Sequence, residues 1–397
     1  MIFISAILGL LAGTLTGLIP GLHINLVSIF VLSLFSNFDF ISAEDAFIFI
    51  VSMGITHTFL DFIPSTFIGV PSEDTIMSIM PAHKMVIEGD GQRAIFLALI
   101  GSLFSFLICL LLVPVFLILF PLIASFLEGN IGIALLFVIL LLFFIEGKNG
   151  KLRLSFIIFS LSGILGYFVL NSRMDEPLFP MLSGLFGLSM IICSLKQKSY
   201  IPKQKQCSFI EICKEKIHKS HLFAVLGGGI TGFLPGIGSS QAAVIGGLFQ
   251  KDSDHESFIV MNGGINTVNF FVSMITLFTI GKARNGALVV AKEIMKNFEF
   301  DFLVIVLICL IFVSLSATLI GIFFSRKLSL NIAKFDYGLI LKIILILIIL
   351  ATVLLSGFYG IIVLGLATII GIIAIRLNVP KHNCMACILV PVLLWTI

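Results

Sequence analysis

Long apolar runs, separated by short polar stretches, constrain this chain more than any other feature. Charged residues make up 11% of its 397 residues and hydrophobic residues 59%, whereas a soluble domain carries about 25% charged residues. A helix needs roughly 20 apolar residues to cross a bilayer. Runs near that length lie at 2–19, 22–36, 46–70, 94–127, 131–146, 153–170, 178–195, 219–234, 236–250, 257–280, 301–324, 335–356, 358–376 and 384–397. The sequence therefore predicts an all-α polytopic protein of the cell (plasma) membrane, with roughly 10–14 membrane segments in the lipid bilayer.

Several functional classes are disfavoured. The net charge of +3 gives no indication of a nucleic acid partner. No Walker A motif is present, and His255-Glu256 lacks the second histidine of a zinc-protease helix. Cys384 and Cys387 have redox or metal spacing but open an apolar run, which favours two packed thiols. We expect no enzyme, no metal and no cofactor beyond a coupling ion.

A polar segment, 196–220, divides the chain into two halves, 1–195 and 221–397. Each half contains seven apolar runs, and an odd number of crossings places the halves in opposite orientations, as inverted repeats. The lysines of the segment place it in the cytoplasm. Its part 209–217 fits either an amphipathic helix on the membrane surface or an ordinary solvated linker. The long run 94–127 contains Pro114 and Pro121, and fits either two short spans or one tilted helix.

A glycine-rich stretch recurs in the two halves. Residues 13–22 read GTLTGLIPGL, and residues 228–237 read GGITGFLPGI. The identical pairs are Gly13/Gly228, Thr16/Thr231, Gly17/Gly232, Pro20/Pro235 and Gly21/Gly236. Proline removes a backbone donor and glycine tolerates unusual dihedral angles, so the pattern predicts a helix break at each Pro-Gly pair. Interrupted apolar segments at matching places in two halves indicate a transporter's binding site.

Polar residues follow both breaks. His23 and Asn25 follow the first, and Gly238, Ser239 and Ser240 follow the second. A helix that restarts there presents unpaired N–H groups, which can bind a carboxylate or a phosphate. The same residues are good N-caps, so capping alone also explains them. His23 is either a proton carrier or a hydrogen-bonded histidine within a packed helix.

A second pair of matching segments lies 210 residues apart. Gly54-Ile-Thr-His-Thr58 corresponds to Gly264-Ile-Asn-Thr-Val268, and both bring polar groups into apolar runs. These groups include Thr56 and His57 in the first half, and Asn266 and Thr267 in the second. Asp61 lies one helical turn after His57, on the same face. An ionisable residue inside a span is costly and usually functional, so His57 and Asp61 either relay a proton, hold Na⁺, or form a local packing pair.

The next loops carry opposite charges in the two halves. Glu73 and Asp74 in the first half correspond to the region of Lys282 and Arg284 in the second. If the loops meet, these residues can pair as a gate, or the two cations can contact an anion. Two ordinary loops at the membrane edge explain the same residues.

Several of these motifs resemble those of a known family. Pro235-Gly-Ile-Gly238, Val70-Pro-Ser-Glu73 and the stretch 80–93 are similar to segments of the large membrane subunit of the tripartite tricarboxylate transporters. The order of the motifs is kept along nearly the whole chain. The first repeat departs from the family pattern, because His23 stands where glycine is usual and Asn25 replaces a proline.

The resemblance implies an inverted-repeat permease, a secondary transporter that couples uptake of a small organic anion to Na⁺ or H⁺. The anion would be a di- or tricarboxylate. Family members work with a small membrane subunit and an extracytoplasmic solute-binding protein. The same helix-end chemistry leaves open an alternative function, a translocase (flippase) for a lipid-linked phosphate carrier.

The helix break in the second half generates a prediction. Pro235→Ala combined with Gly236→Ala should abolish transport, because a continuous helix leaves no free N–H groups at that point. Membrane insertion should be unaffected, since the segment stays apolar. Uptake into proteoliposomes and alkaline extraction of membranes measure the two properties, and unchanged uptake would remove the break from the mechanism.

Overall fold

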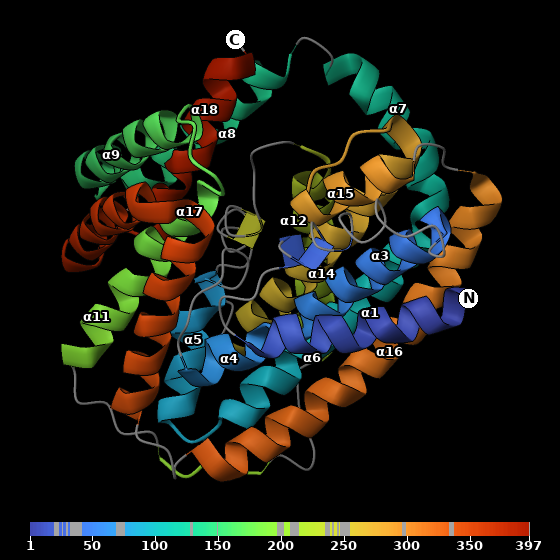
Figure 1. Cartoon of the computed structure of the whole chain (residues 1–397), viewed down its shortest axis with the longest axis horizontal. Coiled ribbons are helices and arrows are strands. Elements are labelled where there is room, and N and C mark those ends of the chain that lie inside the picture. The colour runs from blue at the N-terminus through green and yellow to red at the C-terminus, as the bar shows by residue number, and fades with distance from the viewer. Residues whose placement is uncertain are drawn as a thin grey trace.

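The computed structural model describes residues 1–19, 24–25, 27–28, 31, 42–68, 76–127, 130–148, 150–196, 202–206, 214–234, 239, 242–243, 246, 255–295, 299–332 and 337–396. These residues form helices joined by turns, and this part of the chain contains no strand (Figure 1).

The first half supplies helices at the predicted runs 2–19, 46–70, 94–127, 131–146, 153–170 and 178–195, and a further helix at 76–87 that the sequence did not predict. Most of the predicted run 22–36 lies outside the described residues. The helices of this half are α1 (Ile2–Leu18), α3 (Ala43–Leu60), α4 (Phe62–Ile68), α5 (Ile76–Ile87), α6 (Gly91–Leu111), α7 (Val113–Leu127), α8 (Ile131–Lys148), α9 (Leu152–Leu170), α10 (Leu178–Leu182), the π-helical η1 (Ser183–Leu188) and α11 (Ser189–Lys196). The run 94–127 is two helices, which meet at Leu112. Pro114 lies in the first turn of α7, where a missing backbone N–H costs little.

The second half repeats much of this order. Its helices are α12 (Lys214–Phe233), α14 (His255–Ile280), α15 (Gly286–Ile294), α16 (Phe300–Asn331), α17 (Tyr337–Arg376), the 3-10 helix η3 (Lys381–Met385) and α18 (Ala386–Thr396). Gly357 interrupts α17 with a φ of 64° and a ψ of −162°. Glycine tolerates this conformation, so α17 is two helices that meet where the apolar runs predict a boundary.

The helices confirm a polytopic all-α membrane protein. Six described stretches are long and apolar enough to cross a bilayer: Ala43–Phe67, Gly91–Leu111, Leu152–Leu170, His255–Ile280, Phe300–Asn331 and Leu341–Arg376. Five shorter apolar helices accompany them. The opposite orientation of the two halves stays a prediction.

The halves pack on each other reciprocally. Helices α5 and α6 of the first half pack on α14, while α15 and α16 of the second half pack on α3. In a second group of helices, α9 packs on α18, and α17 packs on η1. Figure 1 shows α9, α11, α17 and α18 on the left of the molecule and the helices around α3 on the right. Neither half is a separate globule in this arrangement.

A buried polar contact also joins the halves within the second group. Glu146 Oε1 of α8 lies 3.2 Å from His382 Nε2 of η3, and both side chains are almost fully buried. Ser155 donates a hydrogen bond to the other oxygen of Glu146. Cys384 and Cys387 pack nearby as buried thiols, as the sequence predicts.

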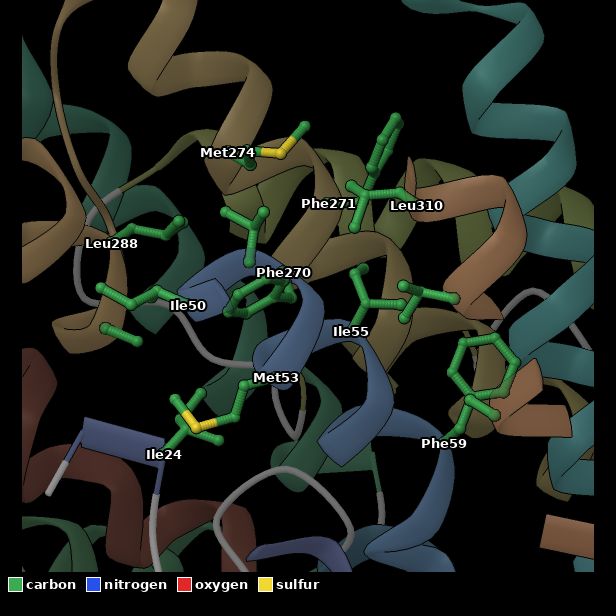
Figure 2. Close-up of a cluster of buried hydrophobic side chains, with 14 of the residues drawn as sticks. Ile24, Ile50, Met53, Ile55, Phe59, Phe270, Phe271, Met274, Leu288 and Leu310 are labelled. Carbon is green, nitrogen blue, oxygen red and sulfur yellow. The ribbon is translucent and has the colours of Figure 1, made fainter. Parts of the chain in front are cut away.

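The main hydrophobic core surrounds α3 and α14. Figure 2 shows part of it, contributed by Ile24, by Ile50, Met53, Ile55 and Phe59 of α3, by Phe270, Phe271 and Met274 of α14, by Leu288 of α15 and by Leu310 of α16. The ring of Phe270 lies directly over Gly54, so a Cβ there would overlap it. The segments at 54–58 and 264–268 thus meet at one crossing.

The glycines of the repeated stretch serve helix packing. A Cβ on Gly13 would lie 2.5 Å from the Met53 carbonyl oxygen, and one on Gly17 would lie 2.8 Å from Leu60 Cβ. On α12, a Cβ on Gly232 would lie 2.7 Å from the Asn269 carbonyl oxygen. Small residues let helices approach closely where lipid offers no hydrophobic driving force. Helix α1 therefore lies tightly along α3, and α12 along α14.

The polar segment between the halves is shorter than predicted. Its last residues, from Lys214, belong to α12, and 209–213 lie outside the described residues. Residues 202–206 lie outside the helices and contact the turn between α5 and α6. Gln204 accepts a hydrogen bond from Gly91 N and donates one to Val86 O.

Two matched glycines give a stability prediction. Gly101→Ala in α6 should destabilise the protein by about 1–3 kcal/mol through overpacking, because the new Cβ would overlap the Val260 carbonyl group. Gly229→Ala in α12 is the control, since nothing lies within 4 Å of its Cβ position. Thermal unfolding in detergent should lower the melting temperature only for Gly101→Ala, and equal melting temperatures would contradict the close packing of α6 on α14.

Candidate functional site

Buried polar groups meet where α3 crosses α14. The side chains of Thr16, His57, Thr58, Asp61, Asn266 and Thr267 are each at most 8% exposed. We call these six residues the crossing cluster. Three helices supply them, α1, α3 and α14, with Asp61 at the end of α3. The cluster joins the two halves of the chain.

His57 contacts the repeated stretch of the first half. Its Nδ1 atom lies 3.1 Å from Thr16 Oγ1. Thr16 faces α3 because Gly13 and Gly17 on the same helix allow the close approach. The repeat thus supplies a partner for His57 in addition to a helix break.

Asp61 is held by an amide from the other half. Asn266 Nδ2 lies 3.0 Å from Asp61 Oδ2 and 3.3 Å from Asp61 Oδ1. The same amide nitrogen lies 3.4 Å from the Thr58 carbonyl oxygen. Thr58 Oγ1 donates to the Ile55 carbonyl oxygen over 2.8 Å and accepts from Thr267 Oγ1 over 3.2 Å. The contacts fix α3 against α14 at their polar faces.

The site is chemically unequal between the halves. The position 210 residues after His57 is Thr267, and the position 210 residues after Asp61 is Phe271. The first half supplies an imidazole and a carboxylate, and the second supplies an amide and a hydroxyl. A carboxylate at the centre of a membrane helix costs about 2.5–3.5 kcal/mol by insertion measurements, and such groups are usually functional.

A second polar place lies at the start of α15. A Cβ on Gly286 would lie 2.8 Å from the side-chain amide of Asn25, so this residue, which follows the first break, covers the helix start. Asn285 caps the helix through a bond from Ala287 N. Arg284 precedes the cap and is half-buried. Burial lowers the pKa of the Arg284 guanidinium, which nevertheless stays charged at neutral pH. The helix dipole and this cation favour an anion here.

The remaining residues of the predicted site add less to its geometry. Thr56 Oγ1 donates to the Ser52 carbonyl oxygen of its own helix, Ser239 is buried, and Lys282 is exposed. The residues that lie outside the described part of the chain are Pro20, Gly21, His23, Glu73, Asp74, Pro235, Gly236, Gly238 and Ser240. The helix restarts and the gate between acidic and basic loops therefore stay predictions.

The structure adds contacts that sequence reasoning missed. Thr16 belongs to the crossing cluster, and the available signal was its place among the five identical positions of the repeat. The sequence shows Thr58 as a polar group of its apolar run, but not its contact with Thr267. Arg93 of α6 and Glu256 of α14 form an ion pair between the halves, with Nε 2.8 Å from Oε1. Both residues lie at the polar edge of an apolar run, where the pairing partner cannot be read from sequence.

The amide at the crossing gives a stability prediction with a matched control. Asn266→Ala should lower stability by about 1.5–3 kcal/mol, because it removes a bond to a buried charged group. Asn262, equally buried one turn earlier, donates only a bond to the Phe258 carbonyl oxygen of its own helix, so Asn262→Ala should cost less. Melting temperatures in detergent compare the two, and equal losses would argue against a special contact to Asp61.

The chain is similar to known proteins along nearly its whole length. The model of the Tripartite tricarboxylate transporter TctA family matches residues 3–386. An uncharacterized protein of Methanocaldococcus jannaschii is 30% identical over 400 residues, which cover 98% of this chain and 97% of that protein. No solved structure matches the chain. The family match extends over both halves and the crossing cluster, and confirms the resemblance found in the motifs. The chain belongs to the Tripartite tricarboxylate transporter TctA family.

Proposed function

We propose that this protein is a permease that moves a small organic anion, a di- or tricarboxylate, across the membrane together with H⁺ or Na⁺. The observation that carries the proposal is the buried Asp61 carboxylate, bonded to Asn266 of the opposite half and one helical turn from His57. Membership of the family supports a transport role. The two halves make polar contacts with each other in the crossing cluster, so a change in the charge of the cluster affects both halves.

The crossing cluster is suited to a coupling ion. An ionised carboxylate within apolar helices is stabilised by a bound cation. Protonation lowers the cost of burial in another way, because it makes the group neutral. Asn266 supplies a neutral amide, so it holds Asp61 in place without neutralising it. Ion binding at Asp61 therefore changes the electrostatic free energy of the contact between α3 and α14. This coupling would link ion binding to the relative position of the halves.

The start of α15 is suited to the anionic substrate. Asn25 and the helix start come together there from opposite halves, and Arg284 contributes positive charge beside them. A carboxylate can accept hydrogen bonds from such a helix end and pair with a guanidinium. The predicted helix restarts after Pro20 and Pro235 would contribute further N–H groups. By the family, the permease would work with a small membrane subunit and an extracytoplasmic solute-binding protein.

Uptake by purified protein in liposomes tests the proposal. Labelled citrate and other di- and tricarboxylates should accumulate when a proton or Na⁺ gradient is imposed, and ionophores that dissipate the gradient should stop accumulation. Inactivity toward every soluble anion under both gradients would contradict the proposal. If the same vesicles then flip a labelled polyprenyl phosphate, the alternative lipid-carrier function is supported.

Asp61→Asn should lower gradient-driven uptake by about 10- to 100-fold, the range that corresponds to the loss of a bond to a buried charged group. Asp45→Asn is the matched control, because Asp45 is also a buried carboxylate of α3, yet it bonds Ser5 and Ser42 near the helix start. Uptake by Asp45→Asn should stay close to that of the wild type. Equal losses in both variants would show that any buried carboxylate of α3 is needed for folding, and would remove Asp61 from the coupling mechanism.

A further inference from the structure

The hydroxyl group of Thr16 has two neighbours and a single hydrogen. Thr16 Oγ1 lies 3.1 Å from His57 Nδ1 and 3.2 Å from the Gly13 carbonyl oxygen. The side chains of Thr16 and His57 are buried, so a donor or acceptor left without a hydrogen bond there would cost free energy. A carbonyl oxygen only accepts hydrogen bonds, whereas an imidazole nitrogen donates or accepts according to its tautomer. The direction of the Thr16 hydroxyl therefore decides which nitrogen of His57 carries the proton.

Other threonines of the repeated stretches show where such a hydroxyl points. Thr231, the counterpart of Thr16, donates to the carbonyl oxygens of Gly227 and Gly228 at 3.1 and 3.3 Å. Thr14 donates to the Leu10 carbonyl oxygen at 2.8 Å. Donation to a carbonyl three or four residues earlier is the usual choice of threonine within an apolar helix. Thr16 follows the same pattern when it donates to Gly13 and accepts from His57.

We propose that Thr16 is a positioning residue that holds neutral His57 in the Nδ1–H tautomer, so that Nε2 carries the lone pair and receives the coupling proton. The tautomer follows from the contact between Thr16 and Nδ1, and the role in coupling rests on the proposed function. Protonation at Nε2 leaves the bond from Nδ1 to Thr16 intact in both charge states. The imidazole can therefore gain and lose a proton without turning its ring or reversing the Thr16 hydroxyl.

The charges around His57 favour this role. Helices α1 and α4, which flank this part of α3, contain no charged residue. Asp61 lies one turn further along α3, and α14 contributes the neutral Asn266 and Thr267. A protonated His57 would be stabilised by the neighbouring carboxylate. The position equivalent to His57 in the second half is a threonine, so the repeated threonine positions an imidazole only in the first half.

Nitrogen NMR of the full-length protein tests the tautomer directly. Protein labelled with ¹⁵N-histidine in lipid nanodiscs gives distinct signals for protonated and unprotonated ring nitrogens, and His57→Gln identifies those of His57. We expect His57 to be protonated at Nδ1 at a pH where the ring is neutral. Thr16→Ser should preserve this state, while Thr16→Val should shift the tautomer ratio by about tenfold toward Nε2–H.

Thr231→Val is the control, because it alters the same position of the repeat and should leave the His57 signals unchanged. A wild-type His57 protonated at Nε2, or a Thr16→Val protein with an unaltered ratio, would overturn the proposal. Melting temperatures of the variants in detergent separate a loss of folding from a change of tautomer.

Uptake measurements separate this inference from the proposed function. Proton-driven uptake should fall in Thr16→Val, recover in Thr16→Ser and stay unchanged in Thr231→Val. If wild-type protein moves no anion, the proposed function fails, yet the NMR signals still decide the tautomer. If uptake is proton-driven and Thr16→Val transports at the wild-type rate, the positioning role of Thr16 is wrong although the permease function stands.

Discussion

The close packing of α1 and α14 against α3 is the interaction on which the rest of the structure depends. Lipid tails are as apolar as the side chains of a membrane helix, so the hydrophobic effect contributes little to the association of these helices. Gly13 and Gly17 of α1 bring one backbone against α3, and Gly54 of α3 receives the ring of Phe270. Dispersion contacts made at this short distance hold the three helices together. The positions of the polar side chains follow from them.

That packing makes the burial of the polar crossing cluster energetically possible, because it brings the hydrogen-bonding partners together. A buried carboxylate costs about 2.5–3.5 kcal/mol in a membrane helix, and one hydrogen bond to a charged group returns about 1.5–3 kcal/mol. Asn266 approaches both oxygens of Asp61, so its amide offsets much of that cost. A lysine at this place would also compensate the negative charge of the carboxylate, which the neutral amide does not.

The two halves share an order of helices and differ in chemistry. Helix α5 of the first half packs on α14, and α15 of the second half packs on α3. The ionisable side chains of the crossing cluster come from the first half alone, since Phe271 stands at the position equivalent to Asp61. The first half therefore supplies the carboxylate, and the second half supplies the amide that bonds it.

The sequence by itself determined the membrane class, the long apolar helices and the family, but not the short helices α5 and α15. Apolar runs report span length, and Gly357 marks a boundary, because these are properties of short segments. The sequence also singled out His57, Asp61 and Asn266, since polar residues within apolar runs are costly wherever they lie. Only the tertiary structure decided that Asn266 bonds Asp61, that Thr16 meets His57, and that Asn25 covers the start of α15. These pairings depend on the rotation of each helix about its axis and on the distance between the two backbones. Both are set by the packing of glycines that lie far apart in the sequence.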